Sequence, residues 1–349
     1  MAQIAAASRV TQSRIPAQIE LGITPDEVRM PDLAPLPAGK RVGFELGWDY
    51  AHHGVTPPVE HLFSNSPLRQ GWQAGQATFG RRTLKARPHT LLWLQLRTHA
   101  WTRGRHFETL LLTPNYLQQL DTDWCPITRH ALDQRSVDRV RDDAGYAAGN
   151  LAVMSPAANQ AKAGHGWAEA SEIARSLAIG PFKEIAGLGS QEWQRIAVLC
   201  SFVTELPHEQ AALIPLHLLP PNRLRLFNPI QALQALVTRQ LATPGWSQRL
   251  ARIEALLPAD ALRADFNRFV LALVPRVLQR QGQLIKPQEI RWALEDAWSD
   301  ALVQKRWARF ALHMTATQAE AVLHKAVAKK LCPLRVQQHA HATEGWALP

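Results

Sequence analysis

Apolar residues recur at helical spacing through the second half of the chain. Residues three or four positions apart lie on one face of a helix, so each run predicts a helix with a buried side. The runs are Trp193, Ile196, Cys200 and Val203, then Ile230, Leu233, Val237 and Leu241, then Trp246, Leu250, Ile253 and Leu257. Residues 262–281 predict a further buried helix, with a kink at Pro275. We therefore expect an all-α domain over residues 168–349, with six or seven helices.

Proline and capping residues predict where two of these helices begin. Pro287 is expected to open a helix that continues through Trp298 and Trp307. The spacing Thr317-x-x-Glu320 predicts a capping box for the last helix, which should end near Pro333.

The pattern changes between residues 136 and 162. Short runs of β-branched and aliphatic residues at 137–140 and 151–153 predict two strands, and the intervening loop carries two glycines. Ser155-Pro156 then supplies an N-cap and a proline at the first helical position. Thr113-Pro114 does the same for a helix that includes residues 116–120. The order strand, loop, strand, helix is therefore expected here.

These patterns predict an α+β protein that is mostly helical. We divide it into a proline-containing N-terminal arm (1–40), a basic, tryptophan-rich region (41–110), a small mixed module (111–167) and the helical domain (168–349).

Composition narrows the partners and the compartment. Lys and Arg outnumber Asp and Glu by 39 to 29, a net charge of +10, which favours nucleic acid first and an anionic membrane surface second. A basic protein with no polyanionic partner is the alternative. The three cysteines are far apart and unpaired in sequence, which fits a reducing cytoplasm. No apolar run reaches the roughly 20 residues of a membrane span, so we expect no spanning segment. Of the two polyanionic partners we expect nucleic acid and no membrane.

Basic side chains alternate with tryptophan and phenylalanine between residues 61 and 110, where Glu108 is the only acid. Cations beside aromatic faces suit a groove that follows a phosphate backbone. A solvated face above a tryptophan-rich core is the alternative. The candidate nucleic-acid contacts are Arg81, Arg82, Lys85, Arg87, Arg103 and Arg105.

Three polar residues of the mixed module have the chemistry of a metal site. Asp138 lies on the first predicted strand, and Asn159 lies about one turn into the helix. If the helix packs across the strands, their oxygens can converge on a hard divalent cation, Mg²⁺ first and Mn²⁺ second. Lys162 follows Asn159 by three residues, on a neighbouring part of the helix surface, where its ammonium is well placed to hold a phosphate. A turn-stabilising aspartate and a surface asparagine are the alternative.

Several short motifs in this module agree in order and spacing with a known family. They are Cys-Pro-Ile-Thr at 125–128, Ser-x-Asp-Arg-Val at 136–140, Gly-Tyr-x-x-Gly-Asn at 145–150, and Asn159 followed by Lys162. Over residues 125–162 the chain resembles the HNH, or ββα-metal, endonucleases. The resemblance implies metal-dependent hydrolysis of phosphodiester bonds, most readily in DNA. It also implies that Asp138 and Asn159 bind the metal and that Asn150 holds the loop.

Two departures from the family pattern matter. Arg139 stands where most members have the general-base histidine, and a guanidinium cannot accept a proton from water. Arg139 could instead clamp a phosphate or pair with a nearby aspartate. His130 is the foremost replacement base because histidine titrates near neutrality. The other candidates are Asp142, Asp143 and His165.

The second departure is the absence of the cysteine pairs that bind zinc in some members. We therefore expect no structural zinc, and we expect Cys125 to be buried. Two functions remain open. The first is a metal-dependent endonuclease, with RNA as a less favoured substrate than DNA. The second is a non-catalytic nucleic-acid-binding or scaffold protein with a degenerate HNH fold.

Overall fold

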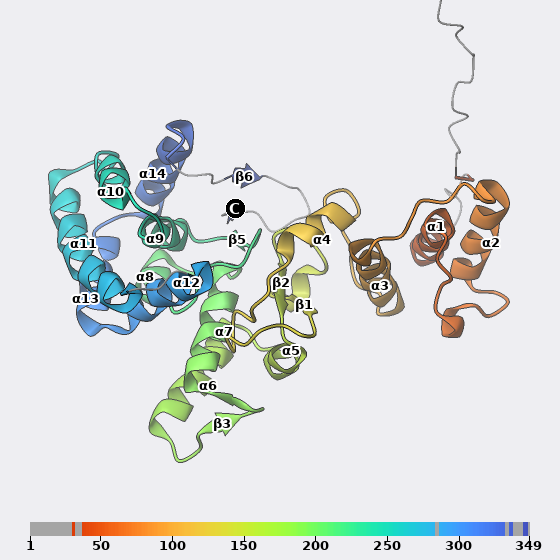
Figure 1. Cartoon of the computed structure of the whole chain (residues 1–349), viewed down its shortest axis with the longest axis horizontal. Coiled ribbons are helices and arrows are strands. Elements are labelled where there is room, and N and C mark those ends of the chain that lie inside the picture. Colours follow the sequence, from red (N-terminus) through yellow and green to blue (C-terminus); the bar gives the residue numbers. More distant parts are fainter. Residues whose placement is uncertain (1–29, 32–36, 283–285, 332–334, 338–344, 348–349) are drawn as a thin grey trace, which may run out of the picture. The chain divides into compact units, whose positions relative to one another are not determined.

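The structure is a computed structural model that describes residues 30–31, 37–282, 286–331, 335–337 and 345–347. These residues are mostly helical with a few short strands, as the α+β expectation requires (Figure 1). No helix among them is both long and apolar enough to cross a membrane. Most of the predicted arm lies outside the described residues.

The chain separates into two compact units, which we describe one at a time. The described part of the first comprises residues 30–31, 37–52 and 56–83, and the second comprises 53–55 and the described residues from 84 onward. The basic region expected at 41–110 is therefore divided between them.

The first unit is a close pair of helices, α1 (Ala38–His52) and α2 (Pro67–Phe79), joined through the short helix η1 (Val59–His61). Glycines let the two backbones touch. A Cβ on Gly47 would lie 1.9 Å from the Leu68 carbonyl oxygen, and one on Gly71 would lie 1.9 Å from the Phe44 carbonyl oxygen. Any larger residue at either position would push the helices apart.

The second unit begins with α3 (Pro88–Thr102) and α4 (Pro114–Leu120). The predicted N-cap of α4 is confirmed, since the Thr113 hydroxyl accepts a hydrogen bond from the Tyr116 N–H at 3.2 Å. The Trp93 indole on α3 donates to the Leu112 carbonyl oxygen at 2.7 Å, which ties the connection before α4 to α3.

The mixed module has the predicted order of elements. Strands β1 (Ser136–Arg139) and β2 (Leu151–Met154) pair antiparallel, with the short helix η2 (Asp142–Ala144) in the loop between them. Helix α5 (Pro156–Lys162) follows at once, because the Ser155 hydroxyl accepts from the Ala158 N–H at 3.3 Å. α5 packs against β1 (Figure 1).

Helices dominate the rest of the described chain. They are α6 (Trp167–Ile179), α7 (Ser190–Phe202), α8 (His208–Leu213), α9 (Pro229–Gln240), α10 (Trp246–Glu254), α11 (Asp260–Gln281), α12 (Pro287–Asp296), η3 (Ala297–Ser299), α13 (Ala301–Leu312) and α14 (Ala316–Ala328). The all-α expectation is wrong in detail, because short strands are present. β3 (Glu184–Ile185) pairs with β4 (Leu188–Gly189), and β5 (Arg225–Leu226), β7 (Gly345–Ala347) and β6 (Arg335–Gln337) form a three-stranded sheet in that order.

Two predicted helix boundaries also need correction. The helix expected from Pro287 through Trp307 is interrupted, because the Asp300 carboxylate accepts from the Leu302 and Val303 N–H groups and starts a new helix, α13. The capping box of the last helix lies two residues earlier than predicted. Thr315 and Gln318 form it, and α14 ends at Ala328.

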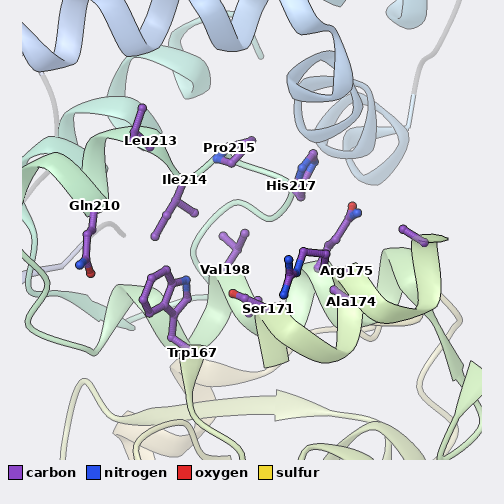
Figure 2. Close-up of a pocket in the computed structure, with 13 residues that line it drawn as sticks. Trp167, Ser171, Ala174, Arg175, Val198, Gln210, Leu213, Ile214, Pro215 and His217 are labelled. Carbon is purple, nitrogen blue, oxygen red and sulfur yellow. The ribbon is translucent and has the colours of Figure 1, made fainter. Parts of the chain in front are cut away.

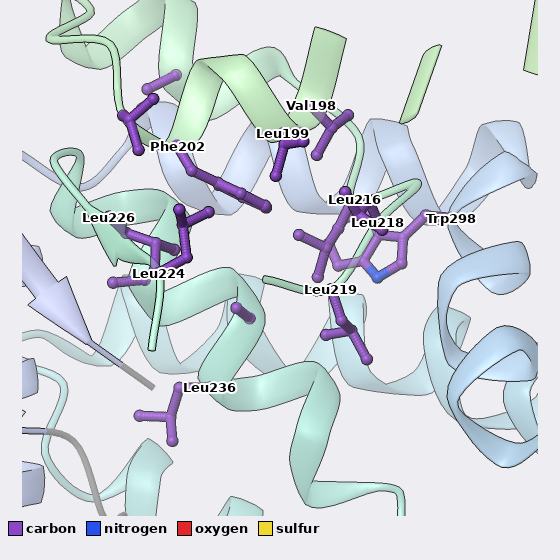
Figure 3. Packing of buried hydrophobic residues seen from close by; sticks show 14 of the residues in the cluster. Val198, Leu199, Phe202, Leu216, Leu218, Leu219, Leu224, Leu226, Leu236 and Trp298 are labelled. Carbon is purple, nitrogen blue, oxygen red and sulfur yellow. The ribbon is translucent and has the colours of Figure 1, made fainter. Parts of the chain in front are cut away.

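One apolar cluster runs from the mixed module into the helical part, so the two fold as one body. Figure 3 shows part of it, where α7 side chains face the segment 216–226 and Leu236 of α9. The labelled residues are Val198, Leu199, Phe202, Leu216, Leu218, Leu219, Leu224, Leu226, Leu236 and Trp298, all buried. Burial of each such side chain is worth about 1.5–3 kcal/mol relative to exposure.

Candidate functional site

Helix α5 lies over one face of β1 and brings the predicted metal residues next to the strand. Ser136 and Asp138 are two residues apart, so their side chains lie on the same face. Asn159 Nδ2 donates to the Ser136 hydroxyl at 2.7 Å. One helical turn further on, Lys162 Nζ donates to Asp138 Oδ1 at 3.2 Å and to the Arg139 carbonyl oxygen at 3.2 Å.

Asp138 and Lys162 form an ion pair inside the protein. Their side chains are 5% and 1% exposed, and Nζ lies 3.1 Å from Asp138 Oδ2. Burial raises the pKa of Asp138, and the neighbouring ammonium of Lys162 only partly opposes that rise. Oδ2 is buried and makes no aligned hydrogen bond with the described residues, although Nζ is close to it.

The position of Lys162 differs from the prediction. The sequence suggests an exposed ammonium that holds a phosphate, but the side chain is buried and directed at Asp138. The reason is local: residues three apart on α5 face residues two apart on β1, so Lys162 meets Asp138 as Asn159 meets Ser136.

Arg139 lies in a salt bridge, which is one of the two roles left open for it. Its guanidinium pairs with the Asp142 carboxylate and donates to the Asp142 carbonyl oxygen at 2.8 Å. The guanidinium also lies 5.1 Å from the centre of the Tyr146 ring. Arg105 approaches the same carboxylate at 3.4 Å. Asp142 therefore holds two cations at the edge of the module.

Asn150 closes the loop between the strands. It is fully buried, its Oδ1 accepts from the Arg141 N–H at 2.9 Å, and its Nδ2 donates to the Arg141 and Gly145 carbonyl oxygens at 2.8 and 2.9 Å. Both N–H groups of the amide and one lone pair of its oxygen are thereby used on backbone groups. Within the described residues the Asn150 amide bonds only to backbone groups, so Asn150 acts as a loop clamp.

The same loop is held from outside by residues that the sequence did not single out. The Gly149 N–H donates to the Tyr116 hydroxyl oxygen at 2.7 Å, and the Ala148 N–H donates to Glu108 Oε2 at 2.8 Å. Burial raises the pKa of Tyr116 to about 12, so the phenol stays neutral. The N-cap signal near Tyr116 reveals a helix start, but a contact over more than 30 residues has no local sequence signal.

The four candidate bases occupy separate positions. His130 is exposed, and its ring makes no hydrogen bond to any described residue. Asp142 is engaged by Arg139, and Asp143 pairs with Arg141 at 2.8 Å. His165 lies 3.5 Å from Glu169. Within the described chain, none of their imidazole or carboxylate groups forms a hydrogen bond or ion pair with the Asp138 carboxylate, and the charge of Asp142 helps to raise the pKa of Asp138.

Cys125 is buried, as predicted, and anchors a tight turn beside the module. Its Sγ accepts from the Ser155 N–H at 3.4 Å and from the Thr128 N–H at 3.5 Å. Burial alone would raise the pKa of this thiol, but the hydrogen bonds from Ser155 and Thr128 outweigh it and lower the pKa. The sulfur links the turn at 125–130 to the start of α5.

The predicted nucleic-acid contacts fall into three groups. Arg81 and Arg82 are exposed in the first unit, whereas Lys85 and Arg87 are exposed in the second. Arg103 is exposed and Arg105 half-buried at the end of α3. Both lie near Tyr146: burial raises the pKa of that phenol, and these two arginines oppose the rise.

The side chains of Asp138, Asn159 and Lys162, in the arrangement described above, do not fit a divalent metal ion. Mg²⁺ requires near-octahedral oxygen ligands at about 2.0–2.1 Å. Asp138 Oδ2 and the Asn159 amide oxygen are the available ligands, but a buried ammonium already lies 3.1 Å from Oδ2. A dication there would meet the like charge of Lys162 in a poorly solvated place. Within the described residues no group of three or more His, Cys, Asp or Glu side chains could hold a metal ion.

Comparison with known proteins gives no relative: no protein-family model, no curated protein and no solved structure matches the chain.

Proposed function

We propose that this protein binds nucleic acid, DNA in preference to RNA, and that its module at 111–167 is a degenerate HNH fold that does not hold a catalytic metal. The observation that carries the proposal is the buried Asp138–Lys162 pair, in which an ammonium 3.1 Å from the carboxylate takes the place a cation would need. The salt bridge between Arg139 and Asp142 also supports the proposal, because the residue at the expected base position is an arginine that is paired with a carboxylate.

Charge supports nucleic acid as the partner. The chain carries a net charge of +10, and Lys85, Arg87 and Arg103 are exposed. Lys85 and Arg87 have no carboxylate partner among the described residues, so their charge is available to phosphates. Binding through these contacts should weaken steeply with salt and be indifferent to the base sequence.

The test is a titration of labelled duplex DNA, single-stranded DNA and RNA with the full chain at several salt concentrations. Each phosphate contact contributes about 0.9 to the slope of log K against log salt. The variant Lys85→Gln/Arg87→Gln should reduce that slope by roughly 1.8 for duplex DNA. The matched control Arg252→Gln/Lys305→Gln also removes two exposed cations of the second unit and should leave it unchanged. Equal slopes for both variants would remove Lys85 and Arg87 from the interface.

A metal-dependent endonuclease is the second candidate. One observation favours it: Asp138 Oδ2 is buried and lacks an aligned hydrogen bond, and Asn159 lies one helical turn from Lys162 on the same side of α5. Cleavage of plasmid DNA with Mg²⁺ or Mn²⁺ that is lost in Asp138→Asn would establish this candidate and overturn the first.

A further inference from the structure

Two cavities adjoin in the second unit, where Arg129 and Trp167 of the mixed module meet the helical part. The larger has a volume of about 560 Å³ and lies between α6, α7 and the segment 210–217 (Figure 2). The smaller has a volume of about 320 Å³. Gln194 and His217 line both, so the two spaces meet at these side chains. Both volumes lie in the range of about 300–1,000 Å³ that is usual for small-molecule sites.

The larger cavity is mostly apolar, with a few polar ends directed into it. Trp167, Val198 and Ile214 supply apolar walls, and Figure 2 shows Trp167 and Ser171 of α6 facing Ile214 across the space. The side chains of Ser171 and Gln194 line it and make no hydrogen bond to another described residue. Flat apolar walls with a few free donors and acceptors suit a planar heterocycle whose edge carries polar atoms.

The smaller cavity is polar and cationic. Arg129, Arg195 and Arg280 line it together with one acid, Asp296. Arg129 is engaged by Asp296 at 2.7 Å and by the buried Glu295 at 3.0 Å. The guanidiniums of Arg195 and Arg280 make fewer hydrogen bonds and ion pairs than that of Arg129.

Arg195 is buried, and some of its hydrogen-bond donors have no acceptor among the described residues. Its Nη1 donates to the Ile127 carbonyl oxygen at 2.8 Å and lies 3.5 Å from Glu192, and its other nitrogens make no hydrogen bond to a described residue. Arg280 is exposed at the rim and has no ion pair in the described chain. A phosphate between Arg195 and Arg280 would receive charge-assisted hydrogen bonds from both.

We propose that the two cavities form one binding site for a nucleobase joined to a phosphate, with the base in the larger cavity beside Trp167 and the phosphate in the smaller one between Arg195 and Arg280. The ligand is then either a free nucleoside monophosphate or the 5′-phosphorylated end of a strand, because both present the same chemistry. The site is independent of the exposed basic residues at 85 and 87, and its test does not depend on theirs.

His217 stands at the junction as a neutral side chain. Burial, assisted by the charges of Arg195 and Arg129, lowers the pKa of His217 to about 4. Its ring makes no hydrogen bond to a described residue and lines both spaces. A neutral imidazole offers one donor and one acceptor, which suits the sugar hydroxyls that link base and phosphate.

The experiment is calorimetric titration of the full chain with adenosine, guanosine, cytidine and uridine 5′-monophosphates, the four nucleosides and inorganic phosphate. We expect at least one nucleotide to bind at least tenfold more tightly than its nucleoside and than phosphate. Short oligonucleotides with 5′-phosphate and 5′-hydroxyl ends separate the two sources. A preference for the phosphorylated end over the free nucleotide identifies a strand end as the ligand.

Variants locate each half of the ligand. Arg280→Gln, at the exposed rim, should weaken nucleotide binding about tenfold, whereas Arg252→Gln, an exposed arginine of α10, should not change it. Ala178→Trp places a large side chain at the exposed edge of the larger cavity and should block the nucleotide, whereas Ala168→Trp, exposed on the same helix but not lining the cavity, should not.

Three results would overturn the proposal. They are no binding of any nucleotide or phosphorylated end, phosphate binding as tight as nucleotide binding, and nucleotide binding that neither Arg280→Gln nor Ala178→Trp weakens. Loss of this site would leave salt-dependent DNA binding intact, so the two proposals fail separately.

Discussion

Replacing Lys162 by methionine would leave Asp138 as a buried carboxylate without a counter-charge. The Nζ–Oδ2 distance is 3.1 Å, and with an effective dielectric constant of 20 Coulomb's law gives about 332/(20 × 3.1), or roughly 5 kcal/mol of attraction. Desolvation of the two ions costs several kcal/mol each, so the intact pair contributes little net stability. Removing one partner should nevertheless cost about 3–5 kcal/mol, because the other charge stays buried.

The size of this loss should depend on pH. A carboxyl whose pKa is raised by folding contributes stability that is present below its unfolded pKa and is lost as pH rises through the folded pKa. Burial already raises the pKa of Asp138, and removal of the Lys162 ammonium takes away what opposes that rise. Lys162→Met should therefore destabilise the protein more at pH 8 than at pH 5.

The assay is urea unfolding of the wild type, Asp138→Leu, Lys162→Met and the double variant at both pH values. The unfolding free energy lost in the double variant should be smaller than the sum of the two single losses by at least about 2 kcal/mol, because the double variant leaves no unpaired charge. Arg175→Gln is the control: it breaks an exposed 2.6 Å pair with Glu172 and should cost no more than about 0.5 kcal/mol. Single losses that simply add would refute the reasoning.

Three further predictions concern the rest of the chain. Since the pKa of His217 falls from 6.5 to about 4 on folding, its neutral burial stabilises the fold above pH 6.5, and up to about 3 kcal/mol is lost as pH falls towards 4; His217→Gln should flatten the dependence of unfolding free energy on pH in that window. Asn150→Ala removes three buried hydrogen bonds and should cost about 2–4 kcal/mol in urea unfolding, with raised amide exchange at 141–150. Gly47→Ala should destabilise the α1–α2 pair, measured as faster amide exchange there, whereas Gly39→Ala, with no atom within 4 Å of the added Cβ, should not.

Local signals in the sequence predicted much of the mixed module. Short runs of β-branched and aliphatic residues predicted β1 and β2, and Ser155-Pro156 predicted the start of α5, because strand-forming runs and N-caps depend on residues close in sequence. The same reasoning failed at Asp300. An aspartate that caps a new helix in the middle of an apolar period is not distinguishable by periodicity from one on a solvated face.

The chemistry of the candidate site was harder to predict because it depends on pairing across elements. Asp138 and Asn159 were expected to share an ion, and each instead has its own partner, Lys162 and Ser136 respectively. Residue spacing fixes which side chains face the strand, but not whether a lysine turns inward to a carboxylate or outward to solvent. That choice depends on burial, and the 1% exposure of Lys162 comes from elements packed around it.

The most direct test is a combined cleavage and binding experiment on plasmid DNA, with and without the full chain. It is run in Mg²⁺, in Mn²⁺ and in a chelator. We expect binding that falls with salt, is the same in all three conditions and leaves the plasmid supercoiled. Nicking that requires the metal and disappears in Asp138→Asn would contradict it.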